Sequence, residues 1–190
     1  MARVILAAAQ KDDDGLVFDP GSAVAEVIRD EEEYSGVRVS MNAELATARV
    51  RFHIDVNVGD PVWPAPSRVS MPRLLGGQPL ELMGYPLHMV HAERIVTAVQ
   101  RGSVNTRWRD FGDVWTLAGK HSVSGDGLHS AIVEVAGYRQ AVLSPLHDLL
   151  QGYPAIAQPK WAAWRRKQRL VDLPEDFGSC SRTSACSPTR

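Results

Sequence analysis

A strict alternation of apolar and polar side chains restricts the fold of this chain more than any other feature. Between residues 49 and 58 every second residue is apolar: Val50, Phe52, Ile54, Val56 and Val58. Because successive side chains of a β-strand point to opposite faces, a period of two predicts a strand with one buried and one polar face. The polar face carries His53, Asp55 and Asn57.

The segments on either side of this strand also favour β-structure. Residues 37–45 alternate in the same way, and residues 42–47 allow the two strands to pair as an antiparallel hairpin. Five prolines between Pro61 and Pro79 predict an irregular loop, and a short strand is expected at residues 80–85.

The chain before residue 37 is expected to hold two helices and a short strand. Residues 2–10 favour a helix, and residues 16–20 favour a strand that ends at Pro20. Ser22 stands where a helix N-cap would, so a second helix is expected from residue 23 to Glu33.

After Pro86 the periodicity changes from that of strands to that of helices. Helices are predicted over residues 87–100, from Asn105 or Thr106 to Gly119, over residues 128–142 and over residues 159–171. In the second of them Trp108, Phe111 and Trp115 share one face, so that face is expected to be buried.

These patterns predict an α+β fold in three parts. Residues 1–85 are expected to form a small mixed sheet with helices, residues 86–178 a helical region, and residues 179–190 a disordered tail. With 44% hydrophobic residues the chain can bury a sizeable core, while 21 basic and 22 acidic residues leave no overall charge that indicates nucleic-acid binding.

Neither a membrane nor an oxidising compartment is expected. No apolar run approaches the roughly 20 residues that span a bilayer. The two cysteines, Cys180 and Cys186, lie in the predicted tail, so they form no disulfide framework and a cytoplasmic location is expected.

Asp55 is the first candidate for chemistry, because a carboxylate on the surface of a sheet is a usual Mg²⁺ ligand in phosphoryl and nucleotidyl transfer. The alternative is a solvated acid of the strand, or an acid paired with Arg51.

Arg94 and His91 lie at i and i+3 on one face of the helix over residues 87–100, and the fork of an arginine suits a phosphate. The alternative is that Arg94 pairs with Glu93 or with Asp110 of the next helix. His88 and His91 at this spacing indicate a metal site only weakly, because no third ligand accompanies them.

Asp110 and Asp113 lie on one side of the following helix, opposite its aromatic face. Asp113 has a structural explanation, since Arg109 precedes it at the spacing of a surface ion pair. Asp110 has less of one, and it is the second candidate for chemistry.

Basic and aromatic residues alternate in the last predicted helix: Lys160, Trp161, Trp164, Arg165, Arg166, Lys167 and Arg169. Such a mixture suits an RNA backbone with stacked bases, and Lys160, Trp164, Arg165, Arg166 and Lys167 are the candidates. The alternative is a core helix whose tryptophans pack inward and whose charges face water.

Four segments, taken together and in order, resemble the AbiEii/AbiGii family of bacterial nucleotidyltransferase-like toxins. They are YSGVRV at residues 34–39, RFHIDV at 51–56, GYP through AERI at 84–95, and TRWRDFGD at 106–113. The resemblance covers roughly residues 15 to 170.

The resemblance implies a DNA polymerase β-like catalytic core, here partial, followed by a helical half. It implies transfer of a nucleotide from an NTP with Mg²⁺ to RNA, with the acceptor end of tRNA as the expected substrate, to block translation. A cognate antitoxin would be the protein partner. Asp55 would lie near the metal, Arg94 would hold the triphosphate, and Asp110 would support catalysis.

Two positions depart from the family pattern. The leading signature of the family, Gly-Ser or Gly-Gly followed by an Asp-x-Asp pair, is not found, so a chain truncated at its N-terminus is expected. Arg94 stands where the family has lysine. The alternative function is therefore an inactive remnant that binds an antitoxin or RNA, and a domain whose charges are purely structural is a third interpretation.

Overall fold

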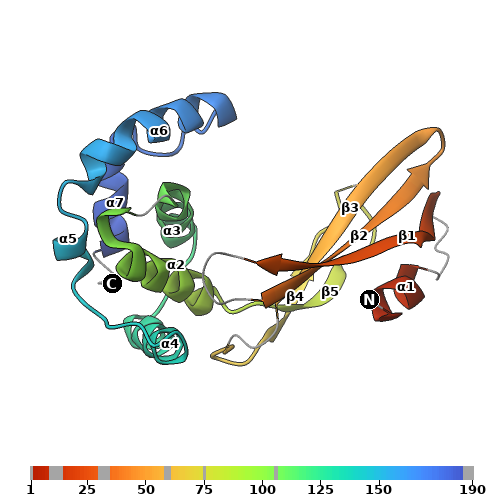
Figure 1. Ribbon diagram of the computed structural model, residues 1–190, viewed down its shortest axis with the longest axis horizontal. Coiled ribbons are helices and arrows are strands. Elements are labelled where there is room, and N and C mark those ends of the chain that lie inside the picture. Colours follow the sequence, from red (N-terminus) through yellow and green to blue (C-terminus); the bar gives the residue numbers. More distant parts are fainter. Residues whose placement is uncertain are drawn as a thin grey trace. The chain divides into compact units, whose positions relative to one another are not determined.

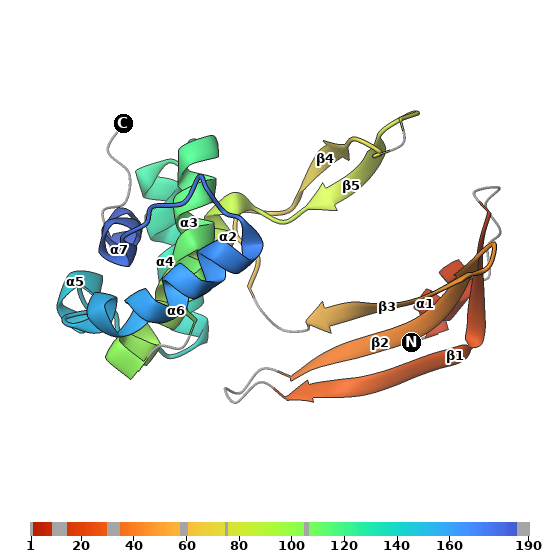
Figure 2. The same ribbon diagram turned by 90° about the horizontal axis from the view of Figure 1, so that it is seen from above.

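The computed structural model describes residues 2–8, 15–29, 35–57, 61–74, 76–104 and 107–185 (Figures 1 and 2). The α+β class predicted from the sequence is confirmed. The chain forms two compact units, Met1–Asp60 and Pro61–Arg190, and the expected boundary after residue 85 falls inside the second unit. No helix in the described part of the chain is long and apolar enough to cross a membrane.

The described residues of the first unit form one helix and three strands: α1 (Ala2–Ala8), β1 (Leu16–Arg29), β2 (Ser35–Leu45) and β3 (Ala48–Asn57). The strands form an antiparallel sheet in the order β1-β2-β3 (Figure 2). The predicted hairpin is confirmed, with a two-residue turn at which Ala46 has a φ of 52°. Val39, Met41 and Ala43 of β2 are each 1% exposed, which agrees with the alternation over residues 37–45. The buried apolar face predicted for residues 49–58 is wrong, because Val50, Ile54 and Val56 of β3 are 39 to 45% exposed.

The helix expected after Ser22 is wrong, because β1 continues through this segment to Arg29. Residues 24–29 pair with residues 35–40 of β2, after a register shift between Asp19 and Val24. The Ser22 hydroxyl donates to the Asp19 carbonyl and accepts from the Asn42 backbone N–H, so it ties the irregular part of the strand to β2 instead of capping a helix. Pairing with β2 thus outweighs the local helix signals.

The second unit contains one hairpin and a group of helices. The elements are β4 (Ser67–Met71), β5 (Leu80–Gly84), α2 (Leu87–Arg101), η1 (Gly102–Val104), α3 (Trp108–Lys120), α4 (Gly125–Tyr138), α5 (Leu146–Leu149), α6 (Tyr153–Gln168) and α7 (Phe177–Ala185). The irregular loop predicted from the prolines is only partly correct, because it contains the strand β4. This strand pairs with β5 in an antiparallel hairpin. A Cβ at Gly84 would lie 2.5 Å from Val69 Cγ1, so the hairpin requires glycine here.

Aromatic side chains form the main core of this unit. Trp108, Phe111, Tyr153, Trp161 and Phe177 are at most 8% exposed, and their ring centroids lie 5.3 to 6.1 Å apart, mostly edge to face. The predicted aromatic face of α3 is therefore confirmed. A smaller apolar cluster, centred on Met89, Val96 and Val135, joins α2 to α4.

Two predictions about the last third of the chain need correction. Helix α6 begins at Tyr153, so Pro159 lies inside the helix and not at its start. The expected disordered tail is wrong for residues 179–185, which belong to α7. Phe177 and Cys180 are fully buried, so two side chains on one face of a polar helix suffice to dock it on the aromatic core. Residues 186–190 lie outside the described part.

The docking of α7 predicts an unreactive thiol at Cys180. Burial raises the pKa of this thiol to about 12, and its Sγ–H donates to the Phe111 carbonyl at 3.4 Å. In a Cys186→Ser variant, which leaves one thiol to measure, we expect iodoacetamide to alkylate Cys180 in urea but not in the folded protein at pH 8, because the reactive species is the thiolate. Equal rates, followed by mass spectrometry, would contradict the docked helix.

Candidate functional site

Arg94 of α2 lies between two carboxylates of α3. Its guanidinium is 3.3 Å from Asp110 Oδ1 and 3.0 Å from Asp113 Oδ2. The two acids stand one turn apart on α3, so both project on the side that faces α2. The alternative that paired Arg94 with Asp110 across the two helices is therefore confirmed, and Asp113, expected to pair with Arg109, is bound by Arg94.

Asp110 is the most enclosed charge of this group. Its side chain is 13% exposed, and its second oxygen accepts from Arg107 Nε at 3.0 Å. Burial raises the pKa of Asp110, while the positive charges of Arg107, Arg94 and Arg101 oppose that rise. Burial has the larger effect, so this carboxyl holds a proton more readily than an exposed aspartate does.

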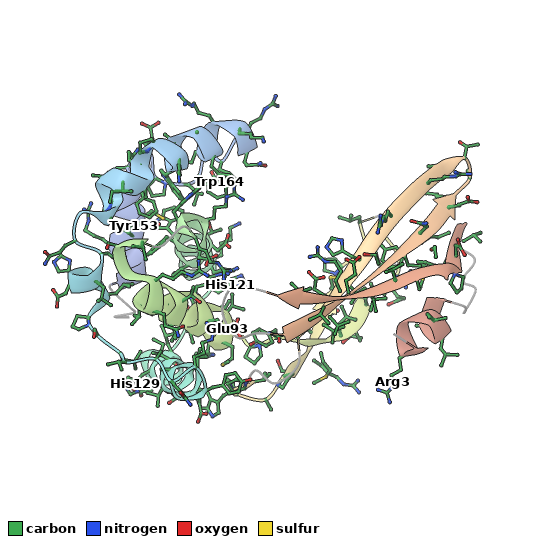
Figure 3. The ribbon with its side chains drawn as sticks, in the orientation of Figure 1. Arg3, Glu93, His121, His129, Tyr153 and Trp164 are labelled. Atoms are coloured by element: carbon green, nitrogen blue, oxygen red, sulfur yellow. The ribbon has the colours of Figure 1, made fainter. Side chains whose placement is uncertain are left out.

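Tyr153, at the start of α6, brings a hydroxyl into the same region. The hydroxyl is buried and has no hydrogen-bond partner among the described residues, and burial together with the negative charge of Asp110 raises its pKa to about 12. In Figure 3 the labelled Tyr153 and Trp164 lie on the side of α6 that faces α3, where they contact Phe111 and Trp108.

Sequence reasoning left Arg107 and Tyr153 out of the candidate site. Arg107 precedes Asp110 by three residues, a spacing that favours an ion pair, so the sequence held a signal for it. Tyr153 gave no such signal, because it reaches this region only through the packing of α6 on α3.

Asp55 lies on β3 in the first unit and is bound by an arginine. Arg38 stands directly opposite it on β2 and donates to both carboxylate oxygens at 2.7 Å. The expected alternative partner was Arg51, which instead stands opposite Asn42 in the sheet. Hydrogen bonding from Arg38 lowers the pKa of Asp55, so this exposed carboxylate holds a proton less readily than a free aspartate does.

The structure does not complete a metal site around Asp55. No group of three or more His, Cys, Asp or Glu side chains in the described part of the chain could hold a metal ion. The residues present therefore do not fit a bound Mg²⁺ without further ligands, and both oxygens of Asp55 already accept hydrogen bonds.

His91 lies one turn before Arg94 on α2, as the spacing requires, but its side chain is 3% exposed. Burial lowers the pKa of His91, and the nearby charges of His88 and Arg94 act in the same direction. The imidazole is therefore buried and takes up a proton less readily than a free histidine, and its Nε2 has no hydrogen-bond partner among the described residues.

Helix α6 divides the predicted RNA-binding residues into two groups. Lys160, Arg166 and Lys167 are exposed, as a contact with RNA would need. Trp164 packs against Trp108 with ring centroids 5.2 Å apart. Arg165 is 16% exposed and lies 4.0 Å from Glu175, so its charge is partly withdrawn from solvent.

Comparison with known families agrees with the resemblance that rests on the ordered motifs. The family model described as nucleotidyl transferase AbiEii toxin, Type IV toxin–antitoxin system, matches residues 4–181. The chain belongs to the AbiEii family. No curated protein and no solved structure matches it.

Membership gives the AbiEii chain its general activity and its biological setting. It is a nucleotidyltransferase-type toxin, and a toxin of a toxin–antitoxin system implies an antitoxin as its partner. Within this AbiEii chain, Arg94 and Asp110 come from two of the segments on which the resemblance rested, and they are in contact.

Proposed function

We propose that this AbiEii chain transfers a nucleotide from an NTP to RNA and that the acceptor end of tRNA is its substrate. The transfer would join the α-phosphate to a terminal hydroxyl of the RNA and release pyrophosphate, and a tRNA blocked in this way could not support translation. The observation that carries the proposal is the contact of Arg94 with Asp110 and Asp113, because it gathers the charged residues of two family segments in one site.

In the proposed site Arg94 holds the triphosphate. Its side chain is 28% exposed, so one side of the guanidinium can face a ligand while Asp110 and Asp113 hold the other. Arg101 and Arg107 also act on Asp110, which gives three arginines against two acids and a local excess of positive charge. Such an excess favours a polyphosphate. His91, predicted beside Arg94, would support α2 from its buried side.

Asp110 would support catalysis by fixing Arg94. One of its oxygens is bound by Arg94 and the other by Arg107, so neither is free to take up a second task without breaking an ion pair. A carboxylate held in this way restricts the orientation of the guanidinium, and a fixed cation stabilises developing charge better than a mobile one.

Mg²⁺ is part of the proposal through the family, since nucleotidyltransferases generally use an NTP with a divalent metal. Asp55 is the carboxylate that we propose as its ligand. A metal there would have to replace the hydrogen bonds from Arg38, and it would need ligands beyond those that the described residues provide.

The exposed cations of α6 would bind the RNA backbone. Replacing Arg166 and Lys167 by alanine is expected to weaken tRNA binding and to reduce the slope of log K against log salt by about 0.7 to 0.9 for each phosphate that the protein no longer binds. Arg165, which is partly buried, should contribute less. Filter binding at several salt concentrations measures the slope, with Arg68→Ala on β4 as the control; an unchanged slope would remove α6 from the RNA site.

The protein would act in the cytoplasm, where NTPs and tRNA are present, and its antitoxin would counter it there. Coexpression tests the biological part of the proposal. Growth should stop when the toxin is expressed alone and should continue when its antitoxin is expressed with it.

The decisive experiment is label transfer. The protein is incubated with each α-³²P-labelled NTP, Mg²⁺ and total tRNA, and labelled RNA is resolved on a denaturing gel. We expect label at the 3′ end of tRNA. Absence of transfer to any RNA by the folded protein would overturn the enzymatic proposal, and tRNA or antitoxin binding that persists without transfer would favour the alternative of an inactive binding protein.

A further inference from the structure

A cleft of about 700 Å³ runs beside the ion pairs of Arg94, between the second half of α3 and the segment that follows α6. Its volume lies within the usual range for small-molecule sites. Arg94 and Asp113 form part of its lining, so the cleft opens directly onto the candidate site. Its farther lining includes Lys120 at the end of α3 and Arg169 just after α6.

Part of the cleft lining is aromatic and apolar. Trp115 and Trp164 line it, together with Leu170 and Leu173. Both tryptophans are only partly buried, although each packs against the aromatic core on its other side. The Arg109 guanidinium lies over the Trp164 ring, 5.9 Å from its centroid, so Trp115 is the indole better suited to stacking with a planar ring.

The residues that directly follow the lining segment are fixed to α6 by side-chain hydrogen bonds. Trp161 Nε1 donates to the Pro174 carbonyl at 2.9 Å, and Gln158 Nε2 donates to the Glu175 carbonyl at 3.0 Å. The backbone N–H of Phe177 in turn donates to Gln158 Oε1 at 2.7 Å. The wall of the cleft is therefore already formed, and a ligand would lose little affinity to ordering it.

We infer that this cleft binds one nucleotide, with its base against Trp115 and Trp164 and its phosphates toward Arg94 or toward Lys120 and Arg169. The lining combines aromatic rings with three cations, Arg94, Lys120 and Arg169, and two acids, Asp113 and Asp172. Rings and a net positive charge together fit a nucleotide better than they fit a purely apolar ligand. The nucleotide comes from one of two sources: the NTP, or the 3′-terminal residue of the acceptor RNA. The inference rests on the proposed function, because it assigns part of the substrate of that same site.

Binding measurements without transfer test the inference and separate the two sources. Equilibrium dialysis gives the affinity for labelled ATP, for a single-stranded RNA trinucleotide, and for tripolyphosphate, which has the charge but no base. If the NTP base occupies the cleft, Trp115→Ala should weaken ATP binding by roughly tenfold and leave tripolyphosphate unchanged. If the RNA end occupies it, the same change should weaken the trinucleotide and leave ATP unchanged.

Lys120→Ala provides a second variant, because Lys120 is exposed and its removal should not unfold the protein. It should weaken whichever ligand Trp115→Ala weakens. Trp63→Ala and Arg68→Ala, a tryptophan and a cation that are not part of the lining, are the matched controls. The inference is overturned if both cleft variants bind ATP and the trinucleotide as the wild type does.

The outcome is distinct from failure of the proposed function. If the wild-type protein transfers no label but its ATP or RNA binding depends on Trp115, the proposed transfer activity is refuted and the nucleotide site in the cleft is retained. Transfer that is unaffected by both cleft variants, with unchanged binding, would keep the proposed function and refute the cleft.

Discussion

Replacing Arg94 by alanine is expected to reduce nucleotidyl transfer by roughly 100- to 1,000-fold, the usual cost of removing a group that stabilises charge in a transition state. The change removes the guanidinium that lies between Asp110 and Asp113 and leaves two neighbouring acids. These acids would then repel the triphosphate, so both kcat and the affinity for NTP should fall. Label transfer at several NTP concentrations measures the two effects.

Arg94→Lys is the informative companion, because the family pattern has lysine at this position. An ammonium keeps the charge but cannot reach two carboxylates with the geometry of a fork. We expect it to retain activity within about tenfold of the wild type. Arg68→Ala, which removes an exposed cation from β4, should leave the rate unchanged. A fully active Arg94→Ala protein would show that the triphosphate is held elsewhere.

Replacing Phe177 by alanine is expected to lower the free energy of unfolding by about 3 to 5 kcal/mol, the usual cost of removing a buried aromatic ring. The ring is 0% exposed and contacts Phe111, Tyr153 and Trp161 at centroid distances of 5.3 to 5.5 Å. Its loss leaves a cavity and releases α7 from α3. Urea unfolding followed by tryptophan fluorescence measures the change.

Val171→Ala is the matched control, since Val171 is 81% exposed and its truncation should change stability by less than about 0.5 kcal/mol. A Phe177→Ala protein as stable as this control would mean that α7 is not docked in solution. Phe177→Ala should also lose label transfer, because α7 packs against α3, the helix that carries Asp110.

Sequence periodicity predicted the elements whose side chains repeat over several turns or strand residues. The strand predicted from the alternation over residues 49–58 and the aromatic face of α3 both appear, but the apolar side of that strand, predicted to be buried, is exposed at Val50, Ile54 and Val56. Two elements were not predicted from the sequence, for different reasons. In β1, Ser22 and Glu26 are local helix signals, and pairing with β2 outweighs them. Helix α7 is polar, and among its described residues only Phe177 and Cys180 are buried apolar side chains, too few to form a visible period.

The candidate site was predictable where residues are close in sequence or where the family supplies a pattern. The spacing of Asp110 and Asp113 placed both acids on one side of α3, and Arg94 across from them was one of the alternatives considered. The Arg38–Asp55 pair could not be assigned, because the register of a hairpin decides which arginine stands opposite an acid. The buried hydroxyl of Tyr153 depends on tertiary packing alone.

The packing of α7 against α3 has a consequence for the synthesis of the protein. A growing chain contains Arg94 and Asp110 well before it contains Phe177, which closes the aromatic core beneath them. Until α7 has been synthesised and has docked, the residues of the site lack the packing that supports them. We therefore expect the site to become ordered only after α7 has joined the aromatic core.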